Sequence, residues 1–244
     1  MSLPDSEVAH VTLETGIRAH LTDVLERIAR AAIRAGRNPR SVRLIAVSKS
    51  FSVEHVRAAA LAGQADFGEN RVQEGLLKIA ASTDLPIRWH LVGHLQSNKA
   101  RKAAQAFACV HSADRLELLD RLEAAASEAG TTPDLLVQVD LGGEPTKYGA
   151  AAEAVRALFD RARTCRSVRV VGLMTLPPFT TDPEGARPFF RRLREIRDGL
   201  LDDGVASSML RELSMGMSHD FEVAIDEGAT MVRVGTAIFG PREA

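Results

Sequence analysis

The chain has 244 residues, 45% of them hydrophobic, and a formal net charge of −1 at pH 7. This length suits one large α/β domain or two small ones, and the hydrophobic content is sufficient for a sizeable core. The near balance of acidic and basic residues argues against a strongly electrostatic nucleic-acid or membrane partner.

A long helical pattern opens the chain, from Val8 to Gly36. Its apolar residues recur at the spacing of a helix face, and Asn38 and Pro39 follow its end. Beyond it, short β-rich runs alternate with helical stretches rich in Ala, Arg and Glu. We predict strands at Arg43–Val47, Ala65–Phe67, Arg88–Val92, Phe107–His111, Leu135–Val139, Val168–Leu173, Glu212–Met215 and Met231–Val234. We predict helices between them at Val53–Ala62, Arg71–Ala81, Lys99–Gln105, Arg115–Ala129, Ala150–Arg163, Gly185–Leu201 and Phe221–Glu227.

The repetition of strand and helix indicates the fold class. Eight repeats favour a (β/α)8 TIM barrel, with an open doubly wound sheet as the alternative. Most of the strands lack strict alternation, as expected where both faces of a parallel strand are buried. No linker or composition break divides the chain. We therefore predict one barrel domain over residues 1–244, with the extra N-terminal helix at about 8–36 and the barrel at about 43–240.

The cysteines and the N-terminal residues predict the cellular compartment of the protein. Cys109 and Cys165 lie far apart without CxxC spacing, which is typical of two reduced thiols. The first ten residues are polar and contain no signal-peptide pattern. No run approaches the roughly 18 apolar residues that a transmembrane helix needs. We expect a cytoplasmic protein.

Lys49 is the first candidate site residue. It directly follows the apolar run that we predict to be the first strand. The C-terminal strand ends of a barrel carry its functional groups, and partial desolvation there favours the neutral, nucleophilic form of an amine. An amine of this kind reacts with aldehydes, so the position indicates Schiff-base chemistry.

Two glycine-containing turns follow the predicted seventh and eighth strands. The first runs from Ser214 through Gly216 to Ser218, and the second contains Gly235 and Thr236. Backbone N–H groups in such turns can approach an anion, and barrels of this class commonly bind phosphate after these two strands. Each turn taken alone is also compatible with a simple capped connection between a strand and a helix.

Arg233 alternates with apolar residues in the predicted last strand. Burying its charge without compensation would be costly. Two interpretations remain open at this level: an internal ion pair with Glu69 or Glu212, or a fixed cation that faces a ligand atom.

The segment around Trp89 carries two histidines, His90 and His94. Alternation places His90 and Val92 on one face of the strand. Because no further His or Cys cluster has ligand spacing, we predict no metal site and expect packing and hydrogen-bonding roles. Asn70 is compatible both with a helix cap and with a site residue.

Several strings occur in an order that resembles the pyridoxal phosphate homeostasis protein family, which is related to the N-terminal domain of alanine racemase. The resemblance spans about residues 44–240, and its most specific strings are Ser214–Ser218 and Val232–Gly240. The full set of strings is Ala46–Lys49, Phe67–Asn70, Trp89–Lys99, Leu173–Met174, Ser214–Ser218 and Val232–Gly240.

The resemblance implies a barrel of the type III pyridoxal-phosphate fold that holds pyridoxal 5'-phosphate (PLP) as a Schiff base. It implies that Lys49 carries PLP, that Arg233 faces the pyridine nitrogen and that Asn70 lines the pocket. The implied phosphate cup consists of Ser214, Gly216, Ser218, Gly235 and Thr236. His94 and Asp140 stand where proline and asparagine are expected, so no shared role is assigned to them.

The implied function is intracellular PLP homeostasis, by buffering or delivering PLP, without robust catalysis. An arginine at the ring nitrogen weakens PLP as an electron sink, and we interpret the only tyrosine, Tyr148, as a loop residue and not as a second base. The alternatives are a low-efficiency amino-acid racemase and a phosphate-binding barrel without PLP. The expected partners are PLP and apo PLP-dependent enzymes, and the expected state is a monomer. A second PLP on Lys99, Lys102 or Lys147 is weakly supported.

Overall fold

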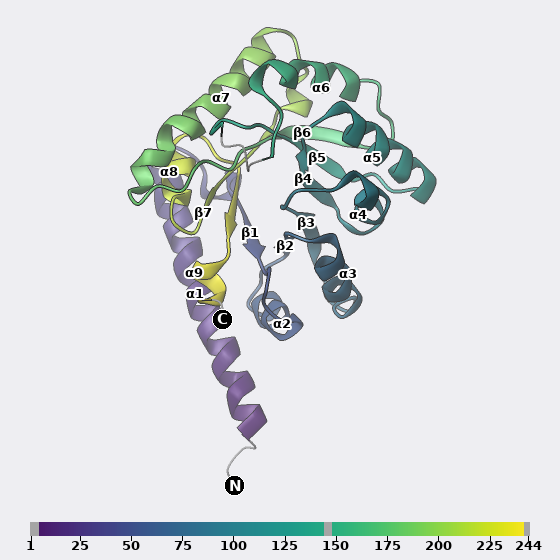
Figure 1. The fold of residues 1–244 in the computed structure, drawn as a ribbon. Helices are drawn as coiled ribbons and strands as arrows, with labels where there is room; N and C mark the ends of the chain where they lie inside the picture. The colour runs from purple at the N-terminus through teal and green to yellow at the C-terminus, as the bar shows by residue number, and fades with distance from the viewer. Residues whose placement is uncertain (1–4, 144–147, 242–244) are drawn as a thin grey trace.

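The protein is a closed parallel barrel of eight strands in the order β1 to β8, seen here in a computed structural model that describes residues 5–143 and 148–241. Helices surround the strands, as Figure 1 shows. The strands are β1 (Arg43–Val47), β2 (Asp66–Glu69), β3 (Arg88–Leu91), β4 (Cys109–Ala113), β5 (Asp134–Gln138), β6 (Arg169–Met174), β7 (Glu212–Met217) and β8 (Met231–Val234). The helices are α1 (Asp5–Arg34), α2 (Val53–Leu61), α3 (Val72–Ala80), α4 (Ala100–Ala106), α5 (Leu116–Ala129), α6 (Val155–Ala162), α7 (Arg187–Asp202), α8 (Phe221–Asp226) and α9 (Thr236–Phe239).

The pairing of the first and last strands confirms the predicted barrel. β1 pairs in parallel with β8, with Leu44 opposite Val232 and Ala46 opposite Val234. This contact closes the sheet, so the alternative of an open sheet is wrong. The bounds of β1 and β8 are those predicted, whereas β2 and β4 begin and end later than predicted. The short α9 after β8 was not predicted.

The strands separate two apolar layers. Ile45 and Val47 of β1 point into the barrel, where they pack with Val92, Cys109 and Met231. The alternate residues of the same strands point outward into the larger core beneath the helices. Because side chains alternate along a strand, Arg233 shares the inward face of β8 with Met231, and His90 shares that of β3 with Val92. The predicted facing of β3 is confirmed.

The N-terminal helix α1 covers one side of the barrel. It contacts α2, α8 and the short α9, and Figure 1 shows its N-terminal part extending beyond the barrel. Its buried face includes Leu21, Val24 and Ile28. Arg27 lies 4.7 Å above the ring of Phe221 and pairs with a carboxylate of α8, which fixes the contact between the helices. Among the described helices, none combines the length and the apolar character needed to cross a lipid bilayer.

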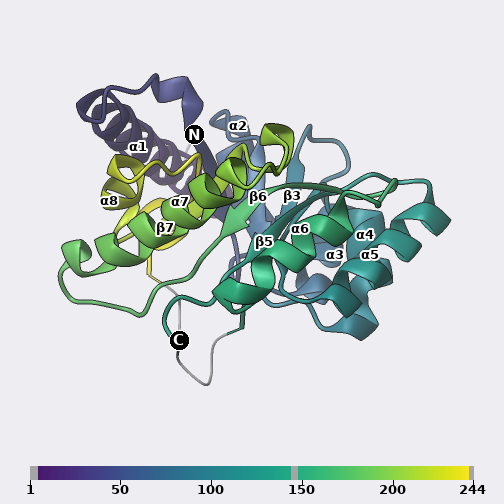
Figure 2. The same ribbon diagram turned by 90° about the horizontal axis from the view of Figure 1, so that it is seen from above.

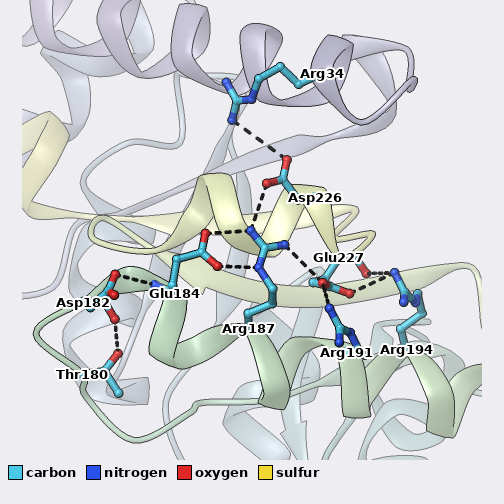
Figure 3. A network of polar contacts seen from close by, with 9 residues as sticks. All are labelled: Arg34, Thr180, Asp182, Glu184, Arg187, Arg191, Arg194, Asp226 and Glu227. Carbon is cyan, nitrogen blue, oxygen red and sulfur yellow. Dashed lines mark hydrogen bonds and ion pairs between the residues drawn. The ribbon is translucent and has the colours of Figure 1, made fainter.

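An ionic cluster joins α7 to the end of α8, as Figure 3 shows. Glu227 is 4% exposed and accepts hydrogen bonds from Arg187 at 3.2 Å and Arg191 at 3.0 Å. Arg194 lies 3.0 Å from its other oxygen. The three arginines lie on one face of α7. Figure 2 shows α8 beside α1, with α7 next to α8. Burial raises the pKa of Glu227, but the hydrogen bonds from Arg191 and Arg187 outweigh it and leave the pKa below the usual 4.5.

We expect Glu227→Gln to lower the free energy of unfolding by about 2 kcal/mol near neutral pH, the scale of a charge-assisted hydrogen bond. A carboxyl with a depressed folded pKa stabilises the protein above its unfolded pKa, and this contribution is lost as pH falls through the folded pKa. The difference between the variant and the wild type should therefore shrink below about pH 4.5. Urea unfolding at neutral and acidic pH measures it. Glu195→Gln, at an exposed position of α7 beside Arg192, is the control and should change little.

Candidate functional site

A cavity of about 440 Å³ lies at the C-terminal ends of the strands. The sequence predicted eight site residues, and most of them line it: Lys49, Asn70, Ser218, Arg233, Gly235 and Thr236. The other two, Ser214 and Gly216, are not part of its lining. The cavity therefore joins residues at or just after the C-terminal ends of β1, β2, β7 and β8, where function is expected in a barrel.

A larger hollow, of about 650 Å³, lies at the opposite end of the barrel. Its charged residues are already engaged in ion pairs: Asp134 pairs with Arg88 at 2.7 Å and with Arg169 at 2.9 Å, and Arg211 lies 3.8 Å from Glu212. The N-terminal strand ends of such barrels ordinarily contribute stability. The smaller cavity is therefore the candidate site.

The turn that carries Lys49 is held by two polar side chains of α3. Lys78 of α3 donates to the backbone carbonyl of Ser48 at 2.7 Å, and the backbone N–H of Ser50 donates to Glu74 at 2.7 Å. Ser50 has φ +67°, the only positive φ of a non-glycine residue in the described part of the chain. A residue held in this sparsely populated region requires support from its surroundings, and the two bonds supply it.

Lys78 was not anticipated as a buried residue. It is 6% exposed and donates to Glu69 at 2.7 Å and to Glu74 at 2.9 Å. Glu69 has no exposed surface and also accepts from the Ser48 hydroxyl at 2.6 Å. Burial raises the pKa of Glu69, against the lowering effect of the Lys78 and Ser48 hydrogen bonds. The spacing of Lys78 in the sequence could have indicated its burial, because it follows Val72 and Gly75 at intervals of three residues and these three residues share the buried face of α3.

Arg233 is a buried cation held by neutral oxygens. It is 4% exposed and donates to the Ser214 hydroxyl at 2.6 Å and to the Thr175 carbonyl at 2.9 Å. The interpretation as an ion pair with Glu69 or Glu212 is wrong, because Glu69 pairs with Lys78 and Glu212 accepts from Thr230. Burial lowers the pKa of Arg233 to about 10, with Asp220 opposing, so the side chain stays charged at neutral pH. A cation in this state at a cavity wall suits a ligand acceptor.

The two predicted phosphate turns are joined to each other. The Ser218 hydroxyl accepts from the backbone N–H of Gly235 at 3.1 Å and of Ala237 at 3.4 Å. Gly216 has φ +93°, and a Cβ there would lie 2.6 Å from the Cβ of Ala224, so only glycine fits. Gly216 therefore shapes the turn from behind the cavity wall, while Ser218 and Gly235 lie at the cavity itself.

Tyr148 and His94 form an aromatic pair at the mouth of the cavity. Both line it, and their rings are stacked with centroids 3.5 Å apart and an interplanar angle of 10°. The sequence interpretation placed Tyr148 in a loop and did not anticipate its position at the cavity. Asp140 does not line the cavity and instead accepts from the backbone N–H groups of Gly142 and Gly143, each at 3.1 Å.

Neither Lys99 nor Lys102, two further lysines that the structure describes, lines this cavity. Lys99 ends the 3-10 turn Ser97–Lys99, and Lys102 is exposed on α4. Lys147 lies outside the described residues. Asn70 does line the cavity, and its carbonyl lies against Gly93, where a Cβ would come within 2.3 Å.

A second polar cluster fills the barrel interior beneath the cavity. The possible ligand atoms of His90, Cys109 and His111 lie within 4.8 Å of one another. The sequence did not reveal this cluster, because its members belong to two strands. The two rings are hydrogen-bonded to each other at 2.9 Å, and burial raises the pKa of the Cys109 thiol, which favours the protonated form.

Comparisons with known proteins cover nearly the whole chain. Residues 20–243 match the family model described as alanine racemase, N-terminal domain. The pyridoxal phosphate homeostasis protein of Aquifex aeolicus is 45% identical over 223 residues, which is 91% of this chain and 97% of that protein. The corresponding protein of Pseudomonas aeruginosa is 45% identical over 228 residues, with 93% and 96% covered.

Two solved structures place the fold. PipY of Synechococcus elongatus with PLP bound superposes with a TM-score of 0.78 at 42% identity, covering 89% of this chain and 100% of that one. Alanine racemase from Streptomyces coelicolor has a TM-score of 0.68 at 20% identity, covering 93% of this chain but 58% of that one. The second likeness shows the fold alone.

Proposed function

The chain belongs to the pyridoxal phosphate homeostasis protein family, and from this premise we propose that it holds PLP as a Schiff base on Lys49 and acts in intracellular PLP homeostasis. One observation carries the proposal: Lys49, Arg233 and the two joined turns meet around a single cavity of about 440 Å³. Relatives of this chain are named for PLP homeostasis, and the structure of PipY contains PLP.

The residues present fit PLP group by group. When bound, PLP supplies an aldehyde carbon for a Schiff base and an electron-accepting ring. Lys49 offers the amine, and the turns at Ser218 and Gly235–Thr236 offer the Ser218 and Thr236 hydroxyls as donors for a phosphate. Asn70 also lines the cavity, and its backbone carbonyl lies against Gly93.

Arg233 determines the protonation state of the PLP ring nitrogen. A guanidinium has N–H donors and no acceptor, so it can only donate toward the ring nitrogen. A donor there disfavours the protonated ring, and the unprotonated ring accepts electrons poorly. This residue therefore favours storage or transfer of PLP over chemistry on an amino acid.

A weak amino-acid racemase is the second candidate, favoured by the position of Tyr148. Racemisation needs an acid or base on each face of the α-carbon. Lys49 can serve one face, and Tyr148 lies at the same cavity. Its stacking on His94 and its 55% exposure place the phenol at the mouth of the cavity, where water competes for it.

The same proposal includes the location, the oligomeric state and the partners of the protein. We place the protein in the cytoplasm as a single domain and a monomer, with PLP and apo PLP-dependent enzymes as partners and without nucleic-acid or membrane partners. A near-neutral net charge of −1 is consistent with this choice.

Transfer of PLP to an apo-enzyme tests the proposal. The purified protein should become yellow on addition of PLP and should reactivate an apo PLP-dependent enzyme, compared with the same concentration of free PLP. Conversion of L-alanine to D-alanine is measured in parallel. A protein that stays colourless with PLP contradicts both functions and leaves a phosphate-binding barrel. Racemisation at ordinary enzymatic rates contradicts the homeostasis function and supports the enzyme.

A further inference from the structure

Five side chains form a continuous hydrogen-bonded chain through the barrel interior. Asp66, at the start of β2, lies 2.8 Å from Nε2 of His90, and Nδ1 of His90 lies 2.9 Å from Nε2 of His111. Nδ1 of His111 lies 2.9 Å from the Ser214 hydroxyl, which lies 2.6 Å from Nη1 of Arg233. We call these five residues the barrel relay.

The carboxylate of Asp66 and the neutral rings of the two histidines fix the direction of the barrel relay. Arg233 can only donate, so it donates to the Ser214 oxygen. The Ser214 oxygen has a second acceptor lone pair, so the Arg233 end by itself does not decide whether the hydroxyl proton points to Nδ1 of His111. At the other end, an ionised Asp66 can only accept, so His90 donates from Nε2. A neutral His90 then accepts at Nδ1 from Nε2 of a neutral His111, and Nδ1 of His111 accepts the Ser214 proton, so both rings carry their proton on Nε2.

The histidines are neutral in this arrangement. His90 and His111 have no exposed surface, and burial lowers the pKa of both rings. The charge of Arg233 lowers the pKa of His111 further. A doubly protonated His111 would present an N–H to Ser214, whose oxygen already accepts from Arg233, and the hydroxyl proton would lose its acceptor. Neutral rings satisfy every ring nitrogen with one hydrogen bond.

We infer that His90 and His111 are positioning residues for Arg233: the barrel relay keeps the Ser214 oxygen an acceptor toward the guanidinium and so fixes the guanidinium at the cavity wall. The inference rests on the proposed function, in which Arg233 faces the PLP ring. With Ser214 committed to His111, Arg233 is anchored at the hydroxyl and at the Thr175 carbonyl, and its orientation is determined at two points. Without the histidines, the Ser214 hydroxyl would be free to turn.

Nitrogen NMR on protein prepared without PLP tests the barrel relay by itself. Two-bond proton–nitrogen spectra distinguish a protonated from an unprotonated ring nitrogen. We expect His90 and His111 each to show an unprotonated Nδ1 and a protonated Nε2. A proton on Nδ1 of either ring, or a doubly protonated ring, at neutral pH overturns the inference. This measurement involves no PLP, so a protein with the expected tautomers that binds no PLP would contradict only the proposed function.

Variants of His111 test the link to Arg233. In His111→Leu the Ser214 hydroxyl has no acceptor, so we expect PLP to bind about tenfold more weakly and the absorbance of bound PLP to shift. His111→Gln, whose amide can accept and donate, should restore part of both. Ser214→Ala breaks the barrel relay with little change in volume and should shift the absorbance in the same sense, even where the leucine variant does not fold.

Cys109→Ala is the matched control, because Cys109 is equally buried beside His111 but takes no part in the barrel relay. It should leave the affinity and the absorbance of bound PLP unchanged. Equal effects of Cys109→Ala and Ser214→Ala would overturn the inference, since a general disturbance of the interior would then explain both. Unchanged absorbance and affinity in the His111→Leu and Ser214→Ala proteins would overturn it as well.

Discussion

Replacing Lys49 with alanine should abolish the covalent attachment of PLP. The wild-type protein with added PLP should stay yellow through gel filtration, and borohydride reduction should fix the pyridoxyl group on the peptide that contains Lys49. The variant should elute colourless and incorporate none. Of the chain's five lysines, Lys49 lines the cavity and Lys78 is engaged by Glu69 and Glu74. An amine is required for the Schiff base, so the expected loss is complete.

Two controls separate a lost nucleophile from a damaged cavity. Lys102→Ala removes an exposed lysine of α4 and should leave colour and incorporation unchanged. Added methylamine should restore part of the absorbance of the Lys49→Ala protein, because the turns at Ser218 and Gly235 and the Arg233 side chain remain. A Lys49→Ala protein that still yields a reducible yellow adduct would assign the attachment to another lysine.

The fold was predictable from the sequence because its signals are local. The apolar runs and the eightfold repetition gave the barrel, and the bounds of β1 and β8 were predicted to the residue. β2 was predicted to stop at Phe67 but continues to Glu69, because a buried carboxylate paired with Lys78 can occupy a strand. That pairing partner comes from α3, so the run of β2 itself does not reveal it.

The candidate site was partly predictable, because some of its residues also carry local sequence signals. Lys49, Ser218, Arg233, Gly235 and Thr236 follow strands, and barrel topology brings strand ends together. The missed features depend on contacts between elements. Lys78 supports the Lys49 turn from a neighbouring helix, and the rings of His90 and His111 meet across two strands. The stack of Tyr148 on His94 depends on the path of a loop, which periodicity does not encode.

Lys78→Met should cause the largest loss of stability among these variants, about 3–5 kcal/mol in the free energy of unfolding. The substitution keeps an unbranched apolar stem but leaves Glu69 charged and buried without its cation. One oxygen of Glu69 already lacks a hydrogen-bond partner in the described structure. The variant also loses the bond to the Ser48 carbonyl, so the turn that carries Lys49 should loosen and PLP should bind more weakly. Chemical unfolding and PLP titration measure the two effects.

The pH dependence and a double variant identify the cause of that loss. A carboxyl whose folded pKa is raised lowers stability only while it is ionised, so the cost disappears as pH falls through the folded pKa. Burial already raises the pKa of Glu69, and removing Lys78 should raise it further, so the loss should shrink from neutral toward acidic pH. Glu69→Gln combined with Lys78→Met should recover most of the stability, because no charge remains buried. A Lys78→Met protein within about 1 kcal/mol of wild type at neutral pH would show that Glu69 does not depend on Lys78 for its charge compensation.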